Sequence, residues 1–64
     1  MTQKELLYVE DAISHEDIII KTLDEMTNTL EDDKLVSFID KQIGKHNNIK
    51  TKLIKLLEEK VNEW

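Results

Sequence analysis

The sequence predicts an all-α protein built as an antiparallel hairpin of two long helices. Two segments repeat apolar residues at helical spacing, about 100° per residue, and a short acidic segment at 31–33 separates them. The chain has no proline and one glycine, and aromatic residues make up only 5% of it, which argues against a small β-barrel. The 64 residues form one domain, 1–64, whose small core needs help from oligomerisation or a bound metal.

The first helix is expected over residues 2–30. Thr2 and Glu5 have the spacing of a capping box, in which each side chain accepts a bond from the other residue's backbone N–H. One arc of this helix is apolar, and Glu16 lies at its centre. The apolar members of the arc are Leu6, Val9, Ala12, Ile13, Ile19, Ile20, Leu23, Met26 and Leu30.

The second helix is expected over residues 34–63, after a turn at 31–33 in which Asp32 or Asp33 can act as the cap. Its apolar arc has His46 at the centre and continues across Gly44 without a change of phase, which favours one unbroken helix. A break near Gly44 would instead give a three-helix bundle. The apolar members of the arc are Leu35, Val36, Phe38, Ile39, Ile43, Ile49, Leu53, Leu56, Leu57, Val61 and Trp64.

The width of the two arcs predicts self-association. Each arc spans roughly 160°, far more than the narrow seam of a two-stranded coiled coil. Two helices cannot cover both arcs, so we expect two hairpins to form a homodimeric, antiparallel four-helix bundle. The expected interface residues are Leu6, Val9, Ile13, Ile20, Leu23, Ile39, Gln42, Ile49, Leu53 and Leu56.

Glu16 and His46 are polar residues at the centres of apolar arcs. If Leu30 pairs with Leu35 across the turn, Glu16 lies about 21 Å and His46 about 16 Å from it. The two side chains are then about a helical turn out of level in one hairpin, which favours contact between subunits. A dimer axis would gather two copies of each residue in one layer, with Gln42 one turn from His46.

Three hypotheses explain this polar layer, because a buried carboxylate without a partner is costly. The first is a hydrogen-bonded set, with Glu16 paired to a histidine or glutamine, which fixes register without any cofactor. The second is metal binding by two Glu16 and two His46 side chains, with zinc, iron or manganese as the metal. The third places Glu16 at a hydrated edge of the bundle.

Charge and motifs exclude several classes of function. Fourteen acidic against nine basic side chains give a net charge of −5, which repels nucleic acid and anionic lipid. The N-terminal residues contain no apolar leader, and the run 18–20 is too short to span a bilayer, so we expect a cytoplasmic protein without membrane or nucleic-acid partners. Ser14 and His15 are adjacent and diverge by about 100° on a helix. We therefore expect no enzyme activity unless the Glu16 layer holds a redox metal.

The run Leu6-Leu7-Tyr8-Val9-Glu10-Asp11-Ala12-Ile13-Ser14-His15-Glu16, with Lys45-His46 after the acidic turn, resembles small ferritin-like, or rubrerythrin-like, helical hairpins of spore-forming bacteria, of the spore-coat-protein-like type. The resemblance covers most of the chain and implies half of a ferritin-like bundle, completed by dimerisation and associated with the spore. Its di-iron relatives use a Glu on one helix and Glu-x-x-His on the next. Glu16 and His46 match two of these ligands, whereas Ile43 occupies the place of the second Glu, which argues against a di-iron site.

Three functions follow as hypotheses. The first is a non-enzymatic dimeric protein with a structural or assembly role connected with sporulation. The second is a metal-binding bundle with redox or storage chemistry at Glu16 and His46. The third is a small acidic interaction module that docks on another helical protein through Leu7 and Ile18.

Overall fold

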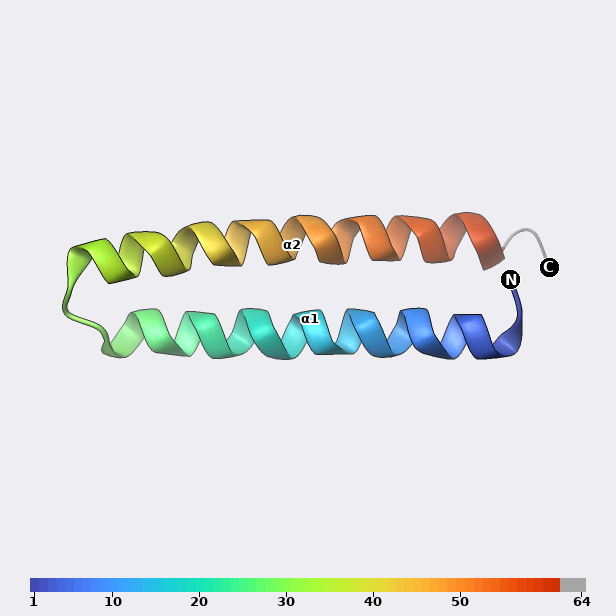
Figure 1. The fold of residues 1–64 in the computed structure, drawn as a ribbon, viewed down its shortest axis with the longest axis horizontal. Helices are drawn as coiled ribbons and strands as arrows, with labels where there is room; N and C mark the ends of the chain where they lie inside the picture. Colours follow the sequence, from blue (N-terminus) through green and yellow to red (C-terminus); the bar gives the residue numbers. More distant parts are fainter. Residues whose placement is uncertain (62–64) are drawn as a thin grey trace.

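The computed structural model describes residues 1–61; the predicted end of the second helix at residue 63 and the predicted core position of Trp64 lie outside this range. Two helices, α1 (Gln3–Thr29) and α2 (Asp33–Val61), run antiparallel and side by side. Their connection lies at one end of the hairpin and the N-terminus at the other (Figure 1). The predicted helical hairpin is confirmed, and α2 passes through Gly44 without the break that a three-helix bundle requires.

The helix α1 begins at the predicted capping box. The Thr2 backbone N–H donates to Glu5 Oε1 over 2.8 Å, and the Glu5 backbone N–H donates to Thr2 Oγ1 over 3.1 Å. The bond from the Thr2 backbone favours the ionised carboxylate, so it lowers the pKa of Glu5 from its ordinary value. At the other end, Leu30 has an extended backbone while its N–H still donates to the Met26 carbonyl, so α1 ends there.

The start of α2 resolves the choice between two candidate caps. Asp32 Oδ1 accepts bonds from the backbone N–H groups of Lys34, over 2.8 Å, and Leu35, over 3.1 Å. These are the second and third residues of the helix, which is the bonding pattern of an N-cap aspartate. Asp32 is therefore the cap, and Asp33 is the first helical residue.

The hairpin is a thin rod with a sparse core. Its principal extents are 49 × 15 × 11 Å, and its radius of gyration of 14.8 Å exceeds the value of about 11 Å expected for a compact chain of this length. Within residues 1–60, for which side-chain burial is described, Ile39 alone is buried, with 7% of its surface exposed. The other apolar residues facing the neighbouring helix are half-buried at best. In the part of the chain that the structure describes, no helix has both the length and the apolar character of a membrane span.

Candidate functional site

Glu16 and His46 form a direct contact between the two helices of a single chain. His46 Nδ1 and Glu16 Oε2 are 2.6 Å apart. Because an ionised carboxylate can only accept, the ring N–H donates. The two side chains are 14% and 27% exposed for Glu16 and His46, respectively, so the pair is mostly shielded from water and each residue supplies the other's partner.

This contact corrects the expectation that the two residues lie about a helical turn out of level in one hairpin, which favoured a contact between subunits. The stretch from Glu16 to Thr29, the last residue of α1, is as long as the stretch from Asp33, the first residue of α2, to His46. Both side chains therefore lie about 20 Å from the turn along their helices. The error came from pairing Leu30 with Leu35, since Leu30 is already outside α1 and α2 begins two residues before Leu35.

A second cross-helix contact accompanies the pair. Lys50 Nζ and Asp17 Oδ1 form an ion pair at 2.5 Å, one residue beyond Glu16 and one turn beyond His46. Gln42, one turn before His46, is half-buried. Asp17 and Lys50 are both partly exposed, so their ion pair adds little to stability but closes one edge of the seam between the helices.

The donor set of one chain does not fit a di-iron site. Glu16 and His46 are one carboxylate and one imidazole, whereas ferritin-like di-iron proteins use several carboxylates together with Glu-x-x-His motifs. Among the described residues, no group of three or more histidine, aspartate or glutamate side chains is placed to hold a metal ion. A metal bound at Glu16 and His46 would need ligands from a second chain.

The second feature of the molecule is a side on which exposed apolar residues gather, here called the open face. Among the residues whose side chains the structure describes, eight large apolar ones are notably exposed, and two of these, Leu7 at 58% and Ile18 at 63%, lie on the outer side of α1. The other six define the open face. They are Tyr8 and Met26 from α1, and Leu35, Phe38, Ile49 and Leu56 from α2.

The spacing of these residues places them on one side of the hairpin. The interval from Tyr8 to Met26 equals the interval from Phe38 to Leu56, and each corresponds to about five full helical turns. Tyr8 and Leu56 line one pocket at the end of the hairpin where the chain begins. Met26 and Phe38 therefore lie on the same side of the hairpin, near the turn. Asp17 lies half a turn away from Tyr8 around α1, which puts its ion pair on the opposite side.

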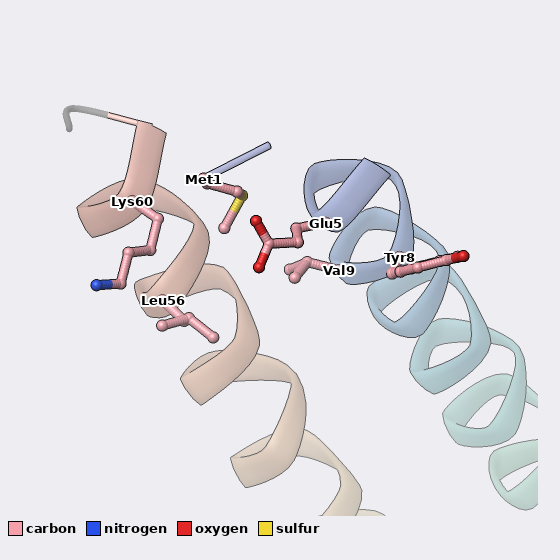
Figure 2. A pocket seen from close by; sticks show the side chains of 6 residues that line it. All are labelled: Met1, Glu5, Tyr8, Val9, Leu56 and Lys60. Atoms are coloured by element: carbon pink, nitrogen blue, oxygen red, sulfur yellow. The ribbon is translucent and has the colours of Figure 1, made fainter. Parts of the chain in front are cut away.

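The pocket at this end is shallow and has a volume of about 460 Å³. Figure 2 shows Glu5 and Val9 on α1, Leu56 and Lys60 on α2, and Met1 between the two helix ends, while the ring of Tyr8 points away from α2. Its lining is mostly apolar, with one acidic and one basic residue. The pocket is the end of the open face, where the two helices leave their apolar side chains only partly covered.

The predicted interface residues fall into two groups. Ile49 and Leu56 are exposed and belong to the open face. The remaining members are buried or half-buried within a single chain: Leu6, Val9, Ile13, Ile20, Leu23, Ile39, Gln42 and Leu53. The interface expected from the sequence omitted Tyr8, Met26, Leu35 and Phe38, although their repeated five-turn spacing was available as a signal.

Two separate patterns thus define the candidate site: a polar pair at the middle of the hairpin, and an open apolar face along its length. Comparison of the chain with known protein families, with curated proteins and with solved structures finds no match. The resemblance to ferritin-like and spore-coat-like hairpins therefore stays a prediction from the sequence.

Proposed function

We propose that this chain is a non-enzymatic structural or assembly protein that works as a homodimer, with two hairpins packed through their open faces into an antiparallel four-helix bundle. The observation that carries the proposal is the open face itself. Six large apolar side chains are exposed on one side of a rod, and exposed apolar residues that gather on one side of a protein are typical of an interaction site.

The area of exposed surface supports a second copy of the chain as the partner. The hairpin exposes 5094 Å². A compact monomer of 7.6 kDa is expected to expose about 4,300 Å², so the excess is about 800 Å² on this basis. A standard protein interface buries about 800 Å² on each partner, and packing of two open faces would therefore give each chain the surface of an ordinary globular protein.

Sedimentation equilibrium of the full chain at micromolar concentration tests the proposal. We expect the mass of a dimer, and we expect Phe38→Glu to abolish the dimer because it places a charge within the apolar interface between the two open faces. Ile18→Glu is the matched control, since Ile18 is at least as exposed as Phe38 but lies outside the open face. A folded wild-type monomer under these conditions would contradict the proposal.

The same control tests the interaction-module hypothesis. If Leu7 and Ile18 form the working surface, Ile18→Glu should abolish binding to a helical partner while the chain stays dimeric. The structural proposal requires no such binding, because it is tested by the mass of the protein in sedimentation equilibrium.

Metal binding is the second candidate function, and it is favoured by the position of Glu16 and His46 halfway along α1 and α2. A two-fold axis would bring two such pairs to one level, which supplies two carboxylates and two imidazoles. Metal analysis of protein dialysed against zinc, iron(II) or manganese separates the candidates. One metal ion per dimer, with a fall in melting temperature after chelation, would favour this function over a purely structural layer.

A further inference from the structure

The hairpin can form a two-fold dimer through its open face in two ways. In the same-end arrangement, the axis runs parallel to the helices, both turns lie at one end, and α1 packs beside the partner's α2. In the opposite-end arrangement, the axis runs across the helices, the turns lie at opposite ends, and α1 packs beside the partner's α1. Both arrangements give antiparallel neighbours, so apolar packing alone does not choose between them.

The two helices carry opposite net charges. Seven acidic residues and two lysines lie within Gln3–Thr29, so α1 has a net charge of −5. Four acidic residues and seven lysines lie within Asp33–Val61, so α2 has a net charge of +3. We propose that the dimer adopts the same-end arrangement, because each acidic helix then lies beside a basic helix of the partner. This inference rests on the proposed dimer and specifies its geometry.

The charges that border the open face support this choice. On α2, four exposed lysines share one line, because their spacings of seven, four and seven residues return to nearly the same angle. These are Lys34, Lys41, Lys45 and Lys52. In the opposite-end arrangement this basic line would pack against its own copy, whereas the same-end arrangement places it along α1 of the partner.

The levels of individual charges match in the same-end arrangement. Rotation about an axis parallel to the helices does not change the height of any residue along the rod. Within one chain, Glu16 is level with His46, and their residue numbers add up to 62. A residue of α1 is therefore level with the α2 residue, in its own chain and in the partner, for which the two residue numbers also add up to 62. By this rule Asp11 lies one residue from the level of the partner's α2 residue Lys52. Lys4 likewise lies one residue from the level of Glu59, so opposite charges meet at both positions.

The same-end arrangement also brings two acidic turns, 31–33, to one end. That repulsion is confined to one end, and the carboxylate of Asp32 is already bonded to the N-terminus of α2, where the helix dipole favours negative charge.

Spin-label distances test the orientation in the full chain. The sequence has no cysteine, so Gln3→Cys places one label per chain at the open end without changing a charge, and Glu31→Cys places one at the turn. The same-end arrangement predicts a label separation of about 15–35 Å for both variants, because the two copies of α1 lie diagonally across a bundle whose neighbouring helix axes are about 8–10 Å apart and each label extends outward from its helix. Separations near the 49 Å length of the hairpin would overturn the orientation while leaving the dimer in place.

A charge exchange gives an independent test. Asp11→Lys should weaken self-association roughly two- to tenfold, because the pair occurs twice in the dimer and exposed pairs contribute modestly. Adding Lys52→Asp should restore the wild-type dissociation constant, and Asp24→Lys, away from the open face, is the control. Failure of the exchange to restore association contradicts the orientation. A wild-type protein that sediments as a monomer and gives no spin–spin distance instead contradicts the dimer on which the inference rests.

Discussion

Replacing His46 with leucine is expected to destabilise the protein, whereas replacing both His46 and Glu16 with leucine is expected to restore most of that loss. In the single variant, the Glu16 carboxylate keeps a site that is only 14% exposed but has no ring N–H to bond. In the double variant, two apolar side chains fill the same seam and no polar group is left without a partner.

The magnitude follows from the burial of the pair. A buried polar group that loses its partner costs about 1–3 kcal/mol, and replacement of both partners by apolar groups can be neutral or stabilising. We therefore expect His46→Leu to lower the free energy of unfolding by about 1–3 kcal/mol and the double variant to lie close to wild type. A loss of about 2 kcal/mol corresponds to a fall in melting temperature of about 8–16 °C for a domain of this size.

Urea unfolding followed by circular dichroism measures the four corners of this double-mutant cycle. All variants should be compared at one protein concentration, because the stability of a dimer depends on it. Asn47→Leu is the control, since Asn47 is exposed and lies half a turn around α2 from Phe38, away from the open face, and a surface change of this kind is expected to alter stability by less than about 0.5 kcal/mol. If the two single losses simply add in the double variant, Glu16 and His46 are not coupled and the reasoning is refuted.

Three further predictions concern the helices. Gly44→Ala should stabilise the protein by about 0.5–1 kcal/mol, because a Cβ there meets no atom within 4 Å, and an unchanged or lower urea midpoint would contradict this. Asp32→Ala should lower the free energy of unfolding by about 1 kcal/mol through loss of the α2 cap, whereas Asp32→Asn should retain most of it. Nuclear magnetic resonance titration should give Glu5 a pKa below its ordinary value, and Thr2→Pro, which removes the backbone N–H that donates to Glu5, should raise that pKa towards it; a low pKa retained in Thr2→Pro would assign the shift to another cause. Because folding lowers this pKa, the stabilising contribution of Glu5 should be complete above the ordinary pKa of glutamate and be lost as the pH falls through the lowered one.

Local signals in the sequence predicted the helices well because each helix start is encoded in a few neighbouring residues. The spacing of Thr2 and Glu5 predicted the capping box that the structure contains, and the acidic turn offered Asp32 and Asp33 as caps. The unbroken phase of the apolar arc predicted correctly that α2 continues through Gly44. Each of these inferences depends on contacts within about one helical turn.

The relation between the two helices was harder to predict because the end of α1 has no strong stop signal. Because Leu30 has an extended backbone and α2 already begins at Asp33, the expected levels of Glu16 and His46 differed by three residues, which was enough to favour a contact between subunits over the contact within one chain. The open face was also missed, because both edges of each arc are apolar and the sequence does not reveal which edge the neighbouring helix covers.

The equal spacing of Glu16 and His46 from the turn restricts how a chain of this kind can change length. Adding seven residues to both arms between the turn and the pair would move each residue by about 10 Å along its helix while nearly preserving its face. The same insertion in one arm alone would pull the two side chains apart by that distance. Lengthening of the hairpin, in evolution or in a redesigned rod, must therefore occur as insertions of equal length in both helices, because only then do the two residues stay level with each other.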